Sequence, residues 1–313
     1  MAEIVVAGSL HLDMLVQAPR LPLPGETLPG SAWAQICGGK GGNQAVAAAR
    51  FGGTVAFLGR VGADAPGARL RAHLQAAGVQ TAALREAAGE SGMSVAITDP
   101  AGEYGAVIVS GANLALDAAA MAAERGLLAS ARVLLLQNEI PPAANAAAAR
   151  IAAAGGALVV LNAAPARALA ADLAPHLGLV VVNAVEAQML GAGPVAGLEE
   201  AARAARHLAQ GCAAIVTAGG AGLAGCAHGR VFTLPAHAVR VVSTHGAGDA
   251  FCGALAVRLA RGDSLEQAAR YANAAAALVV GSAAEARALL SEADVRQFCA
   301  PASLPAASPG HTG

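Results

Sequence analysis

Short, continuous apolar runs recur along the chain, and longer segments with helically spaced apolar positions separate them. The strand-like runs are residues 3–9, 55–62, 133–139, 157–164, 179–183 and 214–219. Apolar strands that alternate with helices are typical of a mostly parallel sheet covered by helices on both faces. The pattern therefore predicts a doubly wound α/β fold, in which ligands bind at the carboxyl ends of the strands.

Two segments depart from this alternation. Residues 13–37 are rich in Pro and contain short alternating pieces, and residues 91–110 have the pattern of a β-hairpin with DPAGE as its turn. We predict that the two segments form a small β lid on the α/β body. The whole is expected to be one domain over residues 1–300, followed by a disordered tail at 301–313.

Composition narrows the class of protein. Hydrophobic residues make up 56% of the 313 residues and charged residues 13%, which allows a large core and excludes disorder for most of the chain. No apolar run reaches the roughly 18 residues of a membrane span, and the first residues lack the basic region of a signal peptide. A net charge of −1 with one Trp argues against a nucleic-acid surface. We expect a cytoplasmic protein without nucleic-acid or membrane partners, whose five widely spaced cysteines are reduced.

Two glycine-rich stretches resemble nucleotide motifs without meeting their requirements. Gly220, Gly222 and Gly225 fit GxGxxG, but that fingerprint must open a helix, and a strand-like stretch follows here. A glycine-rich hairpin fits this stretch better. The sequence GGKGGN at 38–43 has Gly41 where a P-loop requires Ser or Thr.

The stretch STHGAGDAF at 243–251 carries the clearest chemical signal. Gly246 to Gly248 precede Asp249, and helical spacing follows over residues 250–261. The free amides of a first helical turn, together with the helix dipole, form an anion site that glycines open to a phosphate. Asp249 beside it could accept a proton from an attacking hydroxyl, although a simple N-cap is the alternative role.

Other polar residues fall at predicted strand ends or at the lid junction. Lys40 and Asn43 precede a helix, where they could contact substrate hydroxyls, and Asp13 could accept two vicinal hydroxyls or be a solvated turn residue. Asn183 and Glu186 lie on one side of a helix start, where they could hold hydrated magnesium or form a capping box. We expect these residues to converge with Asp249.

The ordered set of motifs resembles the PfkB, or ribokinase-like, carbohydrate kinases. The resemblance rests on GGKGGNQAVAAARFG and STHGAGDAFCGAL, and on shorter pieces in matching order over about residues 3–290: GSLHLD, PGETLPG, GRVGAD, GANLAL, LQNEIP, NAAPAR, NAVEAQMLG and VTAGGAG. It implies a three-layer α/β/α fold with a β lid. It also implies an ATP-dependent kinase that transfers the γ-phosphate to a primary hydroxyl of a small carbohydrate, D-ribose before others.

The resemblance also implies a role for each matched residue. Asp249 matches the catalytic base, and the amides of Gly246, Ala247 and Gly248 match the anion hole. The implied sugar contacts are His11, Asp13, Gly39, Lys40, Gly41, Gly42, Asn43, Glu139 and Asp249. The implied ATP contacts are Asn183, Thr217, Ala218, Gly219, Gly220, Ala221, Gly222, Gly248 and Asn273. Asn183 and Glu186 match the element that governs Mg²⁺ through water, and a monovalent cation such as K⁺ would lie at Ser243, His245, Val279, Ser282 and Ala284.

The chain departs from the family pattern in three places. His11 stands where ribose-phosphorylating members have Asn, which leaves the identity of the sugar open. Ser243 stands where they have an Asp that holds potassium, and residues 281–288 lack the usual glycine-rich loop, so potassium dependence also stays open. Ala184 replaces the Glu that commonly follows the motif's Asn, although Glu186 is kept.

Alternative functions and an assembly follow from the same resemblance. A nucleoside kinase would need an apolar base pocket, for which Trp33, Tyr104 and Met93 are candidate walls. A non-catalytic sugar-binding protein is a more remote alternative, because a binder would have no need for the base in the GAGD motif. Family members often dimerise through the lid, and the apolar pieces MLVQA and VAIT would suit a homodimer.

Overall fold

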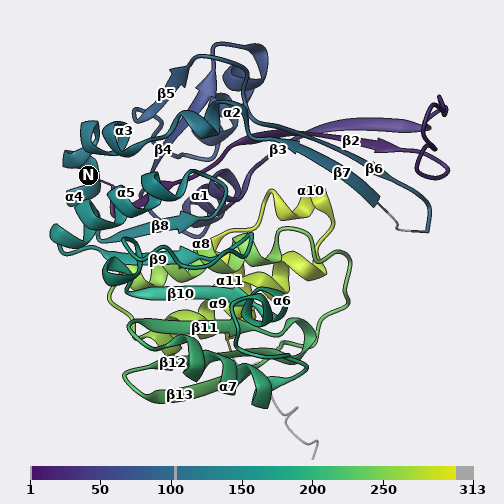
Figure 1. The fold of residues 1–313 in the computed structure, drawn as a ribbon. Helices are drawn as coiled ribbons and strands as arrows, with labels where there is room; N and C mark the ends of the chain where they lie inside the picture. The colour runs from purple at the N-terminus through teal and green to yellow at the C-terminus, as the bar shows by residue number, and fades with distance from the viewer. Residues whose placement is uncertain (1, 102–103, 301–313) are drawn as a thin grey trace, which may run out of the picture.

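The computed structural model describes residues 2–101 and 104–300 (Figure 1). Its strands are β1 (Ile4–Ala7), β2 (His11–Gln17), β3 (Ala32–Gly38), β4 (Val55–Gly62), β5 (Leu84–Ala87), β6 (Met93–Thr98), β7 (Tyr104–Val109), β8 (Val133–Gln137), β9 (Leu158–Asn162), β10 (Leu179–Asn183), β11 (Ala213–Thr217), β12 (Gly222–Ala227) and β13 (Arg230–Pro235). Its α-helices are α1 (Lys40–Arg50), α2 (Ala65–Ala76), α3 (Ala118–Ala123), α4 (Arg125–Ala129), α5 (Pro142–Ala154), α6 (Ala184–Met189), α7 (Leu198–Leu208), α8 (Ala247–Ala260), α9 (Leu265–Gly281), α10 (Ala284–Arg287) and α11 (Glu292–Cys299). Short 3-10 helices are η1 (Gly111–Ala115), η2 (Ala174–His176) and η3 (Gly219–Ala221).

Within the described residues, the larger sheet has nine strands in the order β13-β12-β11-β10-β9-β8-β1-β4-β5. Neighbouring strands from β11 across to β5 are parallel, whereas β12 and β13 are antiparallel. The parallel strands require crossover connections, which the intervening helices supply. All six strand-like runs of the sequence are strands of this sheet.

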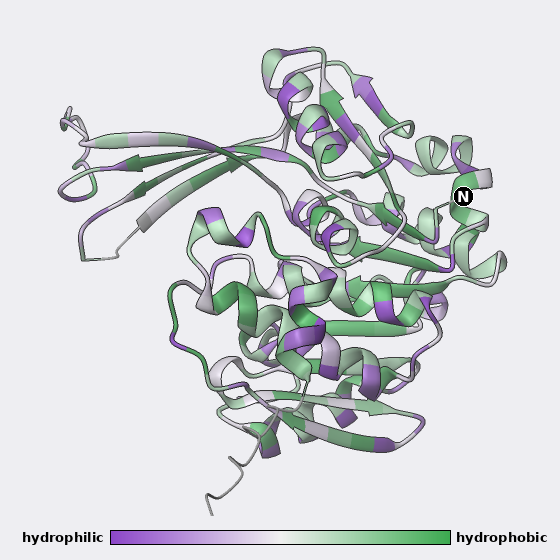
Figure 2. Cartoon of the chain, turned by 180° about the vertical axis from the view of Figure 1, so that it is seen from behind, coloured by the Kyte–Doolittle hydropathy of each residue, from purple (hydrophilic) through white to green (hydrophobic). Residues whose placement is uncertain are grey.

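Helices cover both faces of this sheet, as the alternation predicts. In β1, Ile4 and Val6 join a core with α1, α8 and α9, while Val5 and Ala7 join a second core with α3, α5 and α7. Successive side chains of a strand point to opposite faces, so a strand buried on both sides must be apolar throughout. Figure 2 shows this as hydrophobic colour along the strands of the sheet. The predicted three-layer α/β/α fold is confirmed.

Helices α1 and α8 pack against each other at unusually short range. A Cβ atom added to Gly253 of α8 would lie 2.7 Å from Ala47 Cβ and 2.8 Å from the Gln44 carbonyl oxygen of α1. Real Cβ atoms do not approach neighbours that closely, so the contact requires glycine at this position. The contact brings the N-terminal turns of the two helices together, and those turns carry the polar residues described below.

A smaller sheet with the order β3-β2-β6-β7 projects from the body in Figure 1. Its strands come from the two segments that the sequence singles out, and β6 pairs with β7 antiparallel, which confirms the hairpin. Residues 102 and 103 of the DPAGE turn and the 301–313 tail lie outside the described residues.

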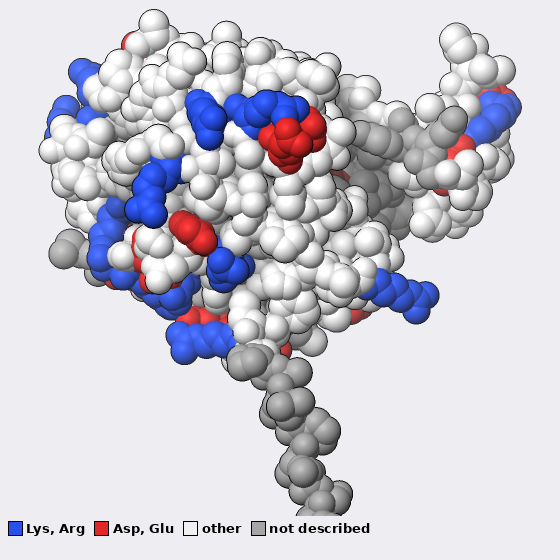
Figure 3. Space-filling model, turned by 90° about the horizontal axis from the view of Figure 1, so that it is seen from below, with Lys and Arg blue, Asp and Glu red and all other residues white. Residues whose placement is uncertain are grey.

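The surface agrees with the low content of charged residues. The face drawn in Figure 3 is largely uncharged, with basic and acidic side chains in small, scattered groups. All five cysteines are unpaired, as expected. Among the described helices, none is long and apolar enough to cross a membrane.

Candidate active site

Asp249 lies in the first turn of α8. The N-cap of this helix is Gly246, whose φ of 76° places it in the left-handed region that favours glycine. The helical hydrogen bonds begin with Ala250 N donating to Gly246 O at 3.0 Å. The amides of Gly248 and Asp249 therefore have no partner within the helix, and together with the helix dipole they favour an anion at this end.

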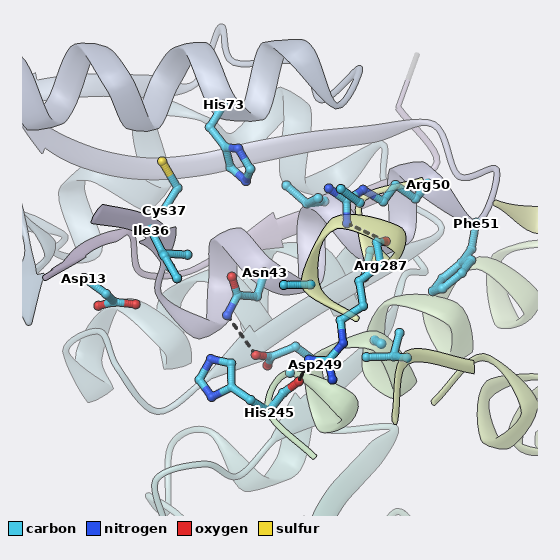
Figure 4. A pocket seen from close by; sticks show the side chains of 18 residues that line it. Asp13, Ile36, Cys37, Asn43, Arg50, Phe51, His73, His245, Asp249 and Arg287 are labelled. Atoms are coloured by element: carbon cyan, nitrogen blue, oxygen red, sulfur yellow. Dashed lines mark hydrogen bonds between the residues drawn. The ribbon is translucent and has the colours of Figure 1, made fainter. Parts of the chain in front are cut away.

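The Asp249 carboxylate is held by two amide side chains of α1. Asn43 Nδ2 donates to Oδ2 at 3.0 Å (Figure 4), and Gln44 Nε2 donates to Oδ1 at 2.9 Å. The carboxylate lies deep in the site, while the residue keeps some exposed surface toward the cavities. Burial raises the pKa of Asp249, and the Gln44 hydrogen bond, the Lys40 charge and the Asn43 hydrogen bond oppose this rise. Asp249 is thus bonded to a neighbouring helix, which differs from the simple N-cap role.

A hydrogen-bonded series of buried amide side chains connects Asp249 to the large sheet. Gln44 Nε2 also donates to Asn162 Oδ1 at 3.0 Å, and Gln44 Oε1 accepts from Gln137 Nε2 at 2.7 Å. Gln44 and Gln137 are completely buried. Gln137 and Asn162 are paired residues at the carboxyl ends of β8 and β9. None of these three residues was expected at the site from the sequence, where the available signal was a polar Gln44 in an otherwise alanine-rich helix.

Glu139 stabilises the N-terminus of α1 from a distant part of the chain. Its Oε2 atom accepts from the Lys40 backbone N at 2.8 Å and from Ser9 Oγ at 2.5 Å, while the N-cap residue Gly39 has no side chain to offer. A carboxylate at this position complements the positive end of the helix dipole. Glu139, a predicted sugar contact, thus satisfies an amide at the start of α1 and bonds to Ser9, and both contacts fix the turn that carries Lys40 and Asn43.

Two predicted sugar contacts come from the lid strand β2. Asp13 lines a cavity together with Asn43 and Asp249, and one of its carboxylate oxygens accepts from Ser94 Oγ on β6. His11 is buried, with 4% of its surface exposed, and its Nε2 atom has no hydrogen-bond partner among the described residues. A buried polar atom without a partner is costly, so it marks a place where a ligand hydroxyl or water would be stabilising.

Three adjoining cavities form a series, and the first two meet at Asp249. The first, of about 250 Å³, lies between the lid and α1 and is lined by Asp13, Ile36, Gly38, Asn43 and Asp249 among others (Figure 4). The second, of about 210 Å³, has Lys40, Asn183, Glu186, Gly248 and Asp249 in its wall. The third, of about 550 Å³, has Thr217, Gly219, Gly220, Gly222 and Asn273 in its wall. Asp249 is shared by the first two cavities, and Asn183 and Gly248 by the second and third, so the three form one route.

The glycine-rich stretch after β11 is a hairpin, as the sequence predicts. Strand β11 ends at Thr217, η3 forms the turn, and β12 begins at Gly222 and returns antiparallel. Ala218 N donates to Gly222 O at 2.7 Å across the turn. Asn273 borders the same third cavity, and its Nδ2 donates to Pro235 O at 2.8 Å.

Asn183 and Glu186 form the reciprocal capping box of α6. Asn183 Oδ1 accepts from Glu186 N at 2.8 Å, and Glu186 Oε2 accepts from Asn183 N at 2.9 Å. Burial raises the pKa of Glu186, as expected for a carboxylate that is partly desolvated. The described residues contain no cluster of three or more side chains that could by themselves hold a metal ion. The pair still fits Mg²⁺, which prefers oxygen ligands and usually keeps several waters and substrate phosphates around it.

Three of the five residues expected around a monovalent cation have their backbone carbonyl oxygens hydrogen-bonded to an arginine. The Arg287 guanidinium donates to the backbone carbonyl oxygens of Ser243, His245 and Ser282. The carbonyl of Val279 accepts from Ser282 N at 3.3 Å. Ala284 is the first residue of α10, the short helix that carries Arg287.

The candidate walls of a nucleoside pocket lie away from the first cavity. Trp33 is 69% exposed and Met93 36% exposed, and the strand register places both on the face of the lid opposite to Asp13. The side chain of Tyr104 lies outside the described residues.

Comparison with known proteins defines the class. The family model "pfkB family carbohydrate kinase" matches residues 1–292. The chain therefore belongs to the pfkB family of carbohydrate kinases, and it is an ATP-dependent sugar kinase.

The similar relatives narrow the class to one kind of kinase. The chain is 32% identical to the ribokinase of Haemophilus influenzae over 280 residues, covering 88% of this chain and 92% of the relative. It is 34% identical to the ribokinase of Bacillus subtilis over 282 residues, covering 90% and 94%. The structure of Arabidopsis thaliana ribokinase complexed with ribose and ATP is similar with a TM-score of 0.89 and 28% identity, covering 95% of this chain and 98% of the other.

Proposed function

We propose that this enzyme phosphorylates the primary hydroxyl of D-ribose and thereby produces ribose 5-phosphate. The observation that carries the proposal is the position of Asp249 at the junction of the first and second cavities. A sugar in the first cavity and a nucleotide phosphate in the second would meet at this carboxylate. Support for ribose comes from the relatives, which are named ribokinase, and from a similar structure that contains ribose and ATP.

Asp249 would act as the base in this reaction. It accepts the proton of the attacking hydroxyl, and its raised pKa makes it a stronger base than an exposed carboxylate. Asn43 and Gln44 hold both of its oxygens in fixed positions, which orients the base before the sugar binds. Of the amides expected in the anion hole, those of Gly246 and Gly248 would stabilise the charge on the transferred phosphoryl group together with the free amide of Asp249, whereas Ala247 N donates to Thr244 O at 3.3 Å.

The nucleotide would occupy the second and third cavities. The residues expected to contact it are Asn183, Thr217 to Gly222, Gly248 and Asn273, which border the third cavity or belong to its hairpin. Lys40 in the second cavity adds a positive charge beside the phosphates. Mg²⁺, held through water by Asn183 and Glu186, would supply charge neutralisation on the phosphate oxygens.

The sugar would be bound between the lid and the α1 turn. Asp13 lies across the first cavity from Asp249, where it could accept hydrogen bonds from two vicinal hydroxyls. His11, two residues before Asp13 on β2, is not among the residues that line the three cavities, and its unpartnered Nε2 atom is buried. No described feature specifically favours a nucleoside, since Trp33 and Met93 face away from this cavity.

The direct test is formation of ADP from Mg-ATP with D-ribose, other pentoses, hexoses and nucleosides, each with wild type and Asp249→Asn. We expect the highest kcat/KM with D-ribose, a product with phosphate on the primary carbon by NMR, and a loss of about 10²–10⁴ in kcat for the variant. Turnover of a nucleoside or another sugar in preference to ribose would overturn the substrate assignment. Normal turnover by Asp249→Asn would overturn the role of the base.

We also propose that the lid pairs with the lid of a second copy of the chain. The face of the lid opposite to Asp13 exposes apolar side chains, namely Trp33, Met93, Val95, Val107 and Val109. Exposed apolar faces of this kind mark interaction surfaces. Val107→Lys should convert a dimer to a monomer in light scattering, whereas Met189→Lys, at an equally exposed apolar residue of α6, should not. A wild-type protein that is monomeric at all concentrations would overturn this proposal.

A further inference from the structure

Arg287 lies at the centre of a set of backbone carbonyls beside the active site. Its Nη2 atom donates to Ser243 O at 2.7 Å, its Nη1 atom to His245 O at 2.9 Å, and its Nε atom to Ser282 O at 2.9 Å. Figure 4 shows the side chain extending from α10 to the backbone at the start of α8, beside His245 and Asp249. Three oxygens from two separate segments thus converge on one guanidinium group.

Carbonyl oxygens that converge on one group carry partial negative charge, so a positive group between them is stabilised. A metal cation can fill that point by replacing its hydration shell with carbonyl oxygens. Arginine can fill it as well, because its guanidinium is always charged and presents several donors in a rigid plane. The protein therefore carries a cation here that is covalently attached and cannot dissociate.

The residues do not fit a bound monovalent ion in addition. Of the five residues assigned to such an ion, Ser243, His245 and Ser282 give their carbonyl oxygens to Arg287, and a second positive charge among them would be repelled. Ser243 also lacks the carboxylate that would offset this repulsion. The carbonyl oxygens therefore bind the Arg287 guanidinium or a small cation, but not both at once.

The carbonyls that Arg287 binds are next to the anion hole. Ser243 and His245 lie three residues and one residue before Gly246, the left-handed N-cap of α8, so holding their carbonyls also holds the segment that leads into the first-turn amides. Arg287 is itself anchored, since its backbone oxygen accepts from Arg50 Nη1 at the end of α1 at 3.3 Å. The side chain thus links the loop before α8 to the segment after α9.

We propose that Arg287 is a positioning residue that takes the place of a monovalent cation and makes phosphoryl transfer independent of potassium. The inference deepens the function proposed above, because it concerns the same anion hole and base. It does not depend on which sugar is the acceptor.

The kinetic test compares wild type with Arg287→Ala and Arg287→Lys in a buffer whose only cations besides Mg²⁺ are bulky organic ones. Wild type should keep the same kcat when K⁺, Na⁺ or Cs⁺ is added. Arg287→Ala should lose about tenfold or more in kcat with little change in the KM for the sugar, since outright loss of an anion-hole donor costs roughly 10²–10³. Added K⁺ or guanidinium should restore its rate, and Arg287→Lys should retain part of the activity because it keeps the charge without the fork. Arg206→Ala, at an exposed arginine of α7, is the matched control and should behave as wild type.

A second measurement does not require turnover. In crystals soaked with rubidium, anomalous scattering should show no ion among the carbonyls of wild type and one ion in Arg287→Ala, and K⁺ should raise the thermal stability of the variant alone. An ion bound in wild type, activation of wild type by K⁺, or an Arg287→Ala enzyme that is fully active without any small cation would each overturn the inference. If no sugar is turned over, the proposed function fails, while the rubidium result still decides whether Arg287 occupies the cation position.

Discussion

Replacing Gln44 by Leu removes the amide that connects Asp249 to the central sheet while keeping a side chain of similar volume. Gln44 is fully buried and makes three hydrogen bonds, to Asp249, Asn162 and Gln137. A hydrogen bond to a charged acceptor contributes about 1.5–3 kcal/mol. Its loss leaves the Asp249 carboxylate less stabilised in the charged form, so the pKa of Asp249 should rise further above its ordinary value.

The consequence is a shift in the pH dependence of catalysis. The acid limb of kcat/KM against pH should move to higher pH in Gln44→Leu, because a larger fraction of the base is protonated at each pH. The plateau kcat should fall by roughly ten- to hundredfold, since the carboxylate keeps Asn43 but loses its second orienting group. Gln44→Glu should move the acid limb further, because it places a second carboxylate beside Asp249.

Stability gives an independent measure of the same network. In Gln44→Leu, Gln137 Nε2 loses its acceptor and Asn162 Oδ1 loses a donor. Each buried polar group left unsatisfied costs about 1–3 kcal/mol, which gives about 2–6 kcal/mol before relaxation. Urea unfolding measures this cost, and Gln188→Leu, at an exposed residue of α6, is the control that should change neither stability nor the pH profile. If the pH profile and plateau of Gln44→Leu superimpose on those of wild type, the amide does not orient the base.

Three further changes test other parts of the site. Asp249→Asn should increase the free energy of unfolding at neutral pH. Burial raises the folded-state pKa of Asp249, so the protonated carboxyl favours folding below its unfolded pKa, and that contribution is lost as pH rises. The gain in the variant should therefore disappear in acid when unfolding is followed across pH. A variant less stable than wild type at neutral pH would contradict this. Gly253→Leu should destabilise by about 1–3 kcal/mol or more in thermal unfolding, because its side chain would overlap Ala47, and an unchanged melting temperature would show that α1 and α8 separate freely. Glu139→Gln should cost about 0.5–2 kcal/mol of stability and raise the KM for the sugar, because it removes the charge that fixes the turn at Lys40; a normal KM in steady-state kinetics would argue against that coupling.

The parts of the fold that follow from local pattern could be predicted from the sequence. The six strands and the β6–β7 hairpin depend on apolar runs and turn residues that are contiguous in the chain. The convergence of Asp13, Asn43 and Asp249 was expected from their places at predicted strand ends or at the lid junction, and the structure brings them together from β2, α1 and α8. The resemblance to a family supplied roles that local pattern leaves open, such as base against N-cap for Asp249.

The supporting residues could not be predicted in the same way. Gln44 and Asp249 are 205 residues apart, and nothing in the spacing around either one indicates that they are hydrogen-bonded. Arg287 lies 44 residues from Ser243, in a segment whose sequence shows only that the family's usual loop is absent. In both cases the function of the side chain is created by the packing of separate elements, and only Gln44 gave a local signal, as a polar residue in an alanine-rich helix.

The placement of charged and neutral donors around the site has a physical reason. An arginine paired directly with Asp249 would stabilise the carboxylate strongly, lower its pKa and make it a weaker base. The structure holds this carboxylate with the neutral amides of Asn43 and Gln44, which orient it while burial keeps its pKa raised. The guanidinium of Arg287 is bonded instead to carbonyl oxygens before α8, where a positive charge organises the backbone. Orientation of the base and organisation of the anion hole are thus assigned to different groups, so the variants at Gln44 and Arg287 should separate them, the first through the pH profile and the second through the cation response.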